Sequence, residues 1–168
     1  MSDLTINISK LSEGTHQRSF DVEAGNVDLD SRFTDRLRVE AVLDKTGHQV
    51  HLRATIHAGG HFSCDRCLDE FEKPVTAQYS IVYIIEEGGP KAQAGDEVQY
   101  LSPDANILDL GEDVRQYLIL AVPQKLLCRD DCKGLCSKCG ANRNKVQCDC
   151  SVKDVDPRWE GLKKVSLN

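Results

Sequence analysis

Eight cysteines are distributed unevenly along this chain of 168 residues, and they form four close pairs. Six lie within residues 128–150, and two lie far upstream in the stretch SCDRCL. The pairs are Cys64/Cys67, Cys128/Cys132, Cys136/Cys139 and Cys148/Cys150. A zinc ion bound by thiolates takes four sulfurs at about 2.3 Å, usually from tight turns that each supply two of them. Four pairs therefore predict two zinc sites.

Turn chemistry and chain proximity predict how the pairs combine. The eight residues between the last two pairs, GANRNKVQ, are rich in turn formers, so a local hairpin can join those pairs. One predicted site therefore comprises Cys136, Cys139, Cys148 and Cys150. The other, a long-range clip between the middle of the chain and its tail, comprises Cys64, Cys67, Cys128 and Cys132. Gly140 suits a turn that needs a positive φ, and a four-residue spacing such as that of Cys128 and Cys132 suits one helical turn.

Three other interpretations of the cysteines stay open. The first is free thiols, which would not require the cysteines to be paired. The second is structural disulfides, which are rare in a reducing compartment. The third is an iron–sulfur cluster, which is also held by thiolates. The run Cys132, Cys136, Cys139 has the C-x3-C-x2-C spacing of a radical-SAM cluster. That chemistry needs a large βα barrel, and only 29 residues follow the motif, so we exclude it.

We expect the zinc sites to be structural and the protein not to be an enzyme. Catalytic zinc keeps an open coordination position and usually has His or carboxylate ligands, whereas the tail contains no His. His57 and His61 precede Cys64 and could replace a sulfur, but histidines in such positions are more often exposed strand residues. A zinc-dependent nuclease and a redox-regulated zinc switch, triggered at Cys148 and Cys150, remain the alternatives.

The composition is that of a globular protein with an acidic body and a basic tail. Hydrophobic residues make up 40% of the chain, and the net charge of −6 argues against nonspecific nucleic-acid binding. Residues 1–124 carry a net charge of −10 and residues 125–168 one of +4, which four thiolates with one zinc ion would lower to about +2. The N-terminal stretch lacks the features of a signal peptide, and no window is apolar enough to span a bilayer. We therefore expect a cytoplasmic protein.

Alternating apolar and polar side chains predict a mostly β, α+β fold. Strands are expected at Leu4 to Leu11, at 18–23, in a hairpin of 32–44 and 48–62 that turns at Gly47, and over 71–87. The first C-x-x-C motif then falls in the turn before the last of these strands. The expected architecture is a partly closed antiparallel β-barrel or sandwich, completed by a helix and a C-terminal cysteine-rich zinc module.

A helix and a tail complete the expected organisation. A helix near 109–122 is expected to close the β-rich domain, which takes residues 1–123. Its apolar face is Val114, Leu118, Ile119 and Val122. The zinc-binding tail takes residues 124–168 and ends in a short helix that begins at Asp156. Trp159 in that helix is expected to fold back on the β-rich domain or the zinc module, the alternative being contact with a partner.

Three stretches together resemble the YceD family of bacterial and plastid proteins. They are SCDRCLDEFEKPV, the run from ILDLGEDV through LCRDDCKGLCSKCGANRN to CDC, and DPRWEGLKKV. The sequence has ANRN where the family more often has xNLN, and Ser137 where proline is common, and neither difference removes a possible ligand. The resemblance implies a role in the accumulation or processing of large-subunit ribosomal RNA, and it carries over no catalytic residue.

The tail is also expected to contact a partner in ribosome assembly, either a ribosomal RNA precursor or ribosomal and assembly proteins. The residues expected to meet phosphates or that partner are Lys133, Lys138, Arg143 and Lys145. Aromatic residues make up only 5% of the chain, which argues against stacking on the bases of single strands. The acidic body could equally bind a basic ribosomal protein.

Overall fold

The computed structural model describes residues 4–87, 97–150, 158 and 161, and the chain divides into two units. Unit 1 comprises Met1–Phe62 and Glu70–Leu126, and unit 2 comprises Ser63–Asp69 and Leu127–Asn168. The helices and strands belong to unit 1, apart from the last residue of one strand, and both cysteine groups belong to unit 2.

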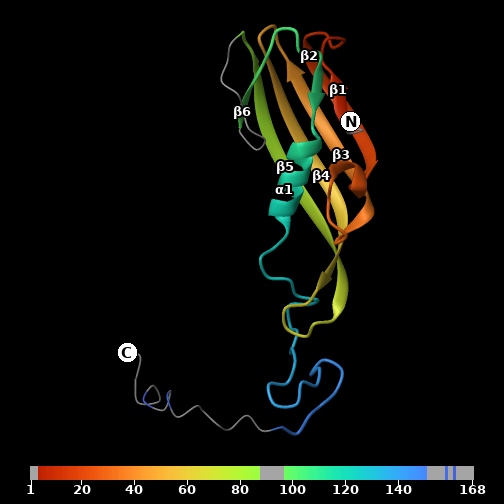
Figure 1. Cartoon of the computed structure of the whole chain (residues 1–168), viewed down its shortest axis with the longest axis vertical. Coiled ribbons are helices and arrows are strands. Elements are labelled where there is room, and N and C mark those ends of the chain that lie inside the picture. The colour runs from red at the N-terminus through yellow and green to blue at the C-terminus, as the bar shows by residue number, and fades with distance from the viewer. Residues whose placement is uncertain (1–3, 88–96, 151–157, 159–160, 162–168) are drawn as a thin grey trace. The chain divides into compact units, whose positions relative to one another are not determined.

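Unit 1 is built on a five-stranded sheet with the strand order β2-β3-β4-β5-β6 (Figure 1). The strands are β2 (Gly14–Glu23), β3 (Phe33–Lys45), β4 (Gln49–Ser63), β5 (Glu70–Ile85) and β6 (Val98–Leu101). Both β2 and β4 run antiparallel to β3, whereas β6 pairs with β5 in parallel. Alternate side chains along β4 and through most of β5 are buried, which is the pattern of a sheet with one face on a core and the other in solvent.

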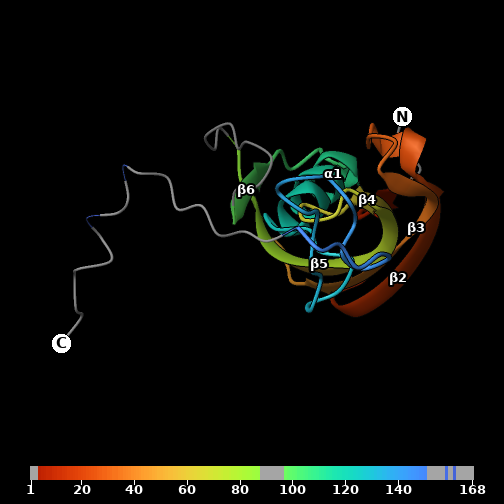
Figure 2. The same ribbon diagram turned by 90° about the horizontal axis from the view of Figure 1, so that it is seen from below.

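The helix α1 (Gly111–Ala121) lies on the inner face of this sheet, which curves around it (Figure 2). It buries Val114 and Leu118 completely. Its Tyr117 ring stacks on Tyr79 of β5, with the ring centroids 4.7 Å apart and the planes 12° from parallel. The hydrophobic core of unit 1 therefore lies between the sheet and this helix.

A second sheet of two strands pairs β1 (Thr5–Asn7) with β7 (Ile107–Asp109) in antiparallel orientation. The segment after β1 is also tied to the main sheet by Lys45, the last residue of β3. The Lys45 ammonium donates hydrogen bonds to the carbonyl oxygens of Ile8 and Leu11, at 2.8 and 2.7 Å. Charge-assisted hydrogen bonds thus add to strand pairing in holding the N-terminal segment.

The described residues confirm a mostly β, α+β fold with one α-helix and a cysteine-rich module. The β3–β4 hairpin and the long strand β5 lie where the alternation of side chains predicts them, and α1 lies within the predicted helix near 109–122. The first C-x-x-C motif lies between β4 and β5. The sheet itself is open in the part of the chain that the structure describes, with β2 and β6 as its edges. Its edge strand β6 has only four residues, and α1 covers the inner face of the sheet.

Three short elements have no clear signal in the sequence. They are the 3-10 helix η1 (Ala24–Val27) and the strands β6 and β7. The terminal helix predicted from Asp156, and Trp159 within it, lie outside the described residues. Among the described helices, none combines the length and the apolar character that crossing a membrane requires.

Two leucines of α1 provide a test of this packing. Leu118 is 0% exposed and Leu120 is 78% exposed, so the same truncation removes a core contact at one position and almost none at the other. We expect Leu118→Ala to lower the free energy of unfolding by about 2–5 kcal/mol and Leu120→Ala to change it by less than about 0.5 kcal/mol. Urea unfolding followed by circular dichroism measures both, and equal losses would contradict the described position of the helix.

Candidate metal centre

Four thiols from distant parts of the sequence meet in the first cysteine group of unit 2. Their Sγ atoms all lie within 4.8 Å of one another and belong to Cys64, Cys67, Cys128 and Cys132. The sulfur of Cys64 lies 3.8 Å from that of Cys132, and the sulfur of Cys67 lies 3.7 Å from that of Cys128. Cys128 is half-buried and the other three are buried. This is the long-range grouping that the spacing predicts.

The second cysteine group is local in sequence and more open. Its Sγ atoms also lie within 4.8 Å of one another and belong to Cys136, Cys139, Cys148 and Cys150. Cys136 is buried, Cys139 is exposed, and the other two are half-buried. Both predicted groupings therefore exist as sets of adjacent thiols, whereas zinc binding by them stays a prediction.

The sulfur separations fit a single tetrahedral ion. Four sulfurs at about 2.3 Å from a zinc ion stand about 3.8 Å apart along each edge of the tetrahedron. The Cys64/Cys132 and Cys67/Cys128 separations of 3.8 and 3.7 Å match that edge. A disulfide would bring two sulfurs to about 2.05 Å, and all eight cysteines are free thiols. An iron–sulfur cluster places several metal atoms between its cysteines and so needs a wider set of sulfurs.

Both C-x-x-C motifs are built on the same backbone turn. The N–H of Leu68 donates to the carbonyl of Cys64 at 2.9 Å, and the N–H of Gly140 donates to the carbonyl of Cys136 at 2.9 Å. The residue that closes each turn is in the left-handed region, with φ of 61° at Leu68 and 71° at Gly140. The positive φ predicted at Gly140 is confirmed. Leu68 adopts the same conformation with a side chain, at a cost of about 1–2 kcal/mol.

Cys128 and Cys132 lie on either side of a hydrogen-bonded turn, which Cys132 closes, and not on a helical turn as the spacing suggested. The Cys132 N–H donates to the carbonyl of Arg129, three residues earlier, at 3.1 Å. This turn is held to the first C-x-x-C motif by Arg66, whose guanidinium donates to the Cys132 carbonyl at 2.9 Å. The Arg66 carbonyl in turn accepts a hydrogen bond from the Leu135 N–H at 2.9 Å. Arg66 therefore connects the two halves of the first group.

The thiols within each group differ in their affinity for protons. Burial raises the pKa of the Cys64 thiol, but surrounding backbone N–H groups, first that of Cys128, outweigh it and bring the pKa to about 6. The Cys139 backbone N–H is the main cause that lowers the pKa of Cys136 to about 6. Burial raises the pKa of Cys128 to about 12, and the Cys139 side chain is the main cause that raises the pKa of Cys150 to about 12. Each group therefore retains protons that a bound metal ion has to displace.

The four basic residues predicted to contact a partner all lie in unit 2, but their surroundings differ. Lys133, Lys138 and Arg143 are exposed. Lys145 is committed to a contact inside the unit, because its ammonium donates to the carboxylate of Asp69 at 2.8 Å. This ion pair is the main cause that lowers the pKa of Asp69. The fold therefore gives Lys145 a role within unit 2 that the sequence did not indicate.

Sequence reasoning missed several residues that hold unit 2 together. Asn142 and Asn144 make side-chain hydrogen bonds to the first cysteine group and to Asp69. Their only signal in the sequence is the turn propensity of the GANRNKVQ stretch, which predicts a turn and says nothing of where the amide groups point. Asp69 has no signal beyond its place after the first C-x-x-C motif.

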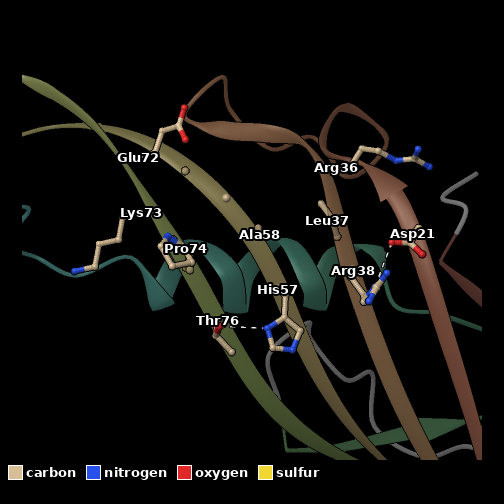
Figure 3. Close-up of a pocket in the computed structure, with 13 residues that line it drawn as sticks. Asp21, Arg36, Leu37, Arg38, His57, Ala58, Glu72, Lys73, Pro74 and Thr76 are labelled. Carbon is tan, nitrogen blue, oxygen red and sulfur yellow. Dashed lines mark hydrogen bonds and ion pairs between the residues drawn. The ribbon is translucent and has the colours of Figure 1, made fainter.

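His57 and His61 belong to neither cysteine group. Both lie on β4, and His57 Nδ1 is 3.3 Å from the Thr76 hydroxyl in a hollow of about 670 Å³ on the sheet of unit 1 (Figure 3). Cations and anions both line this hollow, and Arg38 is paired with Asp21 at 3.4 Å. A lining of mixed charge selects no single class of ligand, so the cysteine groups remain the candidate site.

The fold and the site define a small β-sheet protein that carries a module with two four-cysteine groups. The family model described as "Large ribosomal RNA subunit accumulation protein YceD" matches residues 52–166. The chain therefore belongs to the YceD family of large ribosomal RNA subunit accumulation proteins, which confirms the resemblance read from the sequence. All eight cysteines lie within the matched residues, whereas β1, β2 and β3 precede them.

The chain is also similar to a plant protein, the large ribosomal RNA subunit accumulation protein YCED homolog 1, chloroplastic, of Arabidopsis thaliana. The two are 35% identical over 63 residues, which are 38% of this chain. The match spans only 20% of the plant protein, so this chain corresponds to a small part of that relative. No solved structure matches the chain.

Two glycines of unit 2 test the close approach between its segments. Gly134 and Gly140 both have positive φ, but only at Gly134 would a Cβ atom lie 2.9 Å from the carbonyl oxygen of Arg66, whereas nothing lies within 4 Å at Gly140. We expect Gly140→Ala to cost about 1 kcal/mol from backbone strain alone, and Gly134→Ala to cost at least twice as much. Hydrogen exchange of unit 2 measures both, and equal effects would contradict the contact at Arg66.

Proposed function

We propose that this protein is a non-enzymatic zinc-binding factor that supports the accumulation or processing of large-subunit ribosomal RNA during ribosome assembly. Membership of the YceD family supports the link to ribosomal RNA. The observation that carries the zinc part is the pair of sulfur separations, 3.7 and 3.8 Å, which match a tetrahedral site. The zinc ions act by holding unit 2 in one conformation for a partner to recognise.

The donor set supports a structural role for zinc. Four thiolates fill the tetrahedral coordination of zinc and leave no position for water or a substrate. A zinc-dependent nuclease needs such an open position, and the metal-ligating groups found among the described residues consist of cysteines alone. Backbone N–H groups donate hydrogen bonds to the sulfurs of Cys64 and Cys136, which favours the thiolate forms that bind zinc.

The charge of the filled module limits how a partner is held. Each zinc ion with four thiolates carries a net charge of about −2, so the formal charge of the chain moves from −6 to about −10 when both groups are filled. That charge disfavours long-range attraction to RNA. We propose that the partner in the ribosomal particle is held by short-range contacts of the exposed cations Lys133, Lys138 and Arg143. A reducing compartment, the cytoplasm, keeps the thiols available for zinc.

Metal content tests the zinc part of the proposal. We expect the purified protein to contain about two zinc ions per chain, and Cys64→Ser and Cys148→Ser each to lose about one, because the two substitutions remove a ligand from different groups. Elemental analysis together with thiol titration measures this.

Less than about half an equivalent of zinc with intact thiols would remove zinc from the proposal. A brown protein that absorbs visible light would replace zinc with an iron–sulfur cluster. Loss of the same metal ion by both variants would contradict the two groups.

A triple substitution tests the partner contact. We expect Lys133→Ala/Lys138→Ala/Arg143→Ala to weaken binding to precursors of the large ribosomal subunit at least tenfold while the zinc content stays at two, because three exposed cations are lost and no ligand is changed. If the partner is RNA, the dependence of affinity on salt should also become shallower. Co-sedimentation with precursor particles over a range of salt concentrations measures both.

The matched control is Lys10→Ala/Arg18→Ala/Lys125→Ala, which removes the same charge from exposed positions of unit 1. An equal loss of binding in both triple variants would show a general charge effect. Unchanged binding in the first variant would move the contact surface to the acidic unit 1.

A further inference from the structure

One short segment of unit 2 contacts both halves of the first cysteine group. This linking segment, residues 142–145, lies between Cys139 and Cys148 in the loop that joins the two pairs of the second group. It therefore belongs to the second group by sequence and touches the first group in space. Three of its side chains make these contacts: Asn142, Asn144 and Lys145.

Asn144 contacts the turn that runs from Arg129 to Cys132. Its amide oxygen accepts hydrogen bonds from the Lys133 N–H and from the Arg129 guanidinium, both at 2.8 Å. Because both partners are donors, the orientation of the amide is fixed. The amide nitrogen must then face the Cys132 sulfur, to which it donates at 3.3 Å. Asn144 thus holds this turn and donates a hydrogen bond to its thiol.

Asn142 and Lys145 contact the other half of the first group, the C-x-x-C turn that ends at Asp69. The Asn142 amide nitrogen and the Lys145 ammonium each donate to the Asp69 carboxylate at 2.8 Å. The Asp69 carbonyl accepts the N–H of Cys64 at 2.9 Å, so Asp69 closes the turn that presents the first two thiols. The two asparagines are also joined, since the Asn144 amide nitrogen donates to the Asn142 side-chain oxygen at 3.0 Å.

The linking segment depends on the second group for its own position. Backbone hydrogen bonds close a turn within it, from the Lys145 and Val146 N–H groups to the Asn142 carbonyl, both at 3.0 Å. Another joins it to the residues before the second group, from the Arg143 N–H to the Gly134 carbonyl at 3.0 Å. A metal ion in the second group fixes both ends of this loop, at Cys139 and Cys148. When the second group is empty, the loop samples more conformations. Ordering it so that its side chains reach the first group then costs more conformational entropy.

We propose that the linking segment couples the two centres, so that a zinc ion in the second group raises the affinity of the first group for zinc, an inference that rests on the zinc binding proposed above. Linkage makes the effect reciprocal. Asn142 and Asn144 are positioning residues in this coupling, because they bind no metal ion and act through ligands and turns of the first group.

The overall affinity of the full-length chain for zinc tests the coupling. Competition with a chromophoric chelator gives the two-metal binding constant of the unchanged chain. It also gives the single-site constants of Cys64→Ala/Cys67→Ala and Cys148→Ala/Cys150→Ala. We expect the two-metal constant to exceed the product of the single-site constants by about 10–100-fold, the range for outer-sphere contacts and for coupled sites. Independent sites make the two quantities equal, and that equality would overturn the proposal.

Removal of the two amides tests the route of the coupling. We expect Asn142→Ala/Asn144→Ala still to bind two zinc ions. Its two-metal constant should exceed the product of the single-site constants by no more than about twofold, which is the deviation found between independent sites. Gln147→Ala is the matched control, because it is an exposed amide of the same loop and should keep the full excess. An excess that persists in the double asparagine variant would overturn the proposal.

Cobalt substitution gives a readout that a purely structural role leaves unchanged. The hydrogen bond from Asn144 stabilises the lone pairs of the Cys132 thiolate. Its loss in Asn144→Ala should therefore move the thiolate-to-cobalt charge-transfer band of the first group to longer wavelength, and Gln147→Ala should leave the band in place. An unmoved band in Asn144→Ala contradicts the contact with the thiolate. A chain that takes up no zinc contradicts the proposed function, whereas two bound zinc ions without excess affinity contradict only the coupling.

Discussion

Four thiols held within 4.8 Å of one another cannot all ionise unless a cation lies between them, and the structure of unit 2 depends on that constraint. Two like charges about 4 Å apart repel by about 4 kcal/mol at the effective dielectric constant of a protein surface. The pKa values of the thiols differ within each group. Backbone N–H groups lower the pKa to about 6 at Cys64 and Cys136. Burial raises the pKa of Cys128 to about 12, and the Cys139 side chain is the main cause that raises the pKa of Cys150 to about 12. Without a metal ion each group is a partly ionised set of thiols joined by weak hydrogen bonds. A divalent cation bound there would turn the same set into a rigid crosslink.

The sequence predicted those parts of the fold and of the site whose pattern is contained in a short stretch of residues. C-x-x-C spacing forces two thiols to one side of a tight turn, so the pairs could be read directly, and the grouping of four pairs followed from loop length. Strand alternation located β3, β4 and β5, because a sheet with one buried face repeats every two residues. Leu68 could not be predicted in a left-handed conformation, because a leucine has no preference for it and the hydrogen bond to Cys64 imposes it. The strand β6 has four residues and pairs with β5 alone, so tertiary contact and not its own pattern decides its state.

Lys145 shows why charge alone is a weak guide to a binding surface. In the sequence it is one of four equivalent cations near the cysteines, and only the fold shows that Asp69, 76 residues earlier, neutralises it. Such a partly exposed pair adds little stability by itself. Its position matters more, because the carbonyl of the same Asp69 closes the first C-x-x-C turn. Under the proposed function, recognition of a partner therefore rests on short contacts of individual cations and not on the net charge of the chain.

The two groups differ in the chain entropy that their formation removes, and this difference gives them an order. The second group joins Cys139 to Cys148 across nine positions, whereas the first joins Cys67 to Cys128 across 61. In an unfolded chain the longer closure costs about 1.7 kcal/mol more, by the logarithmic dependence on loop length. The local group is therefore the easier one to fill before unit 1 has folded. Once filled, it holds Asn142 and Asn144 where they can gather the turns of the first group, so that the ion bound first lowers the cost of binding the second. This order of metal binding follows from the position of the loop between Cys139 and Cys148. The loop joins the two pairs of the second group, and its side chains contact the first group.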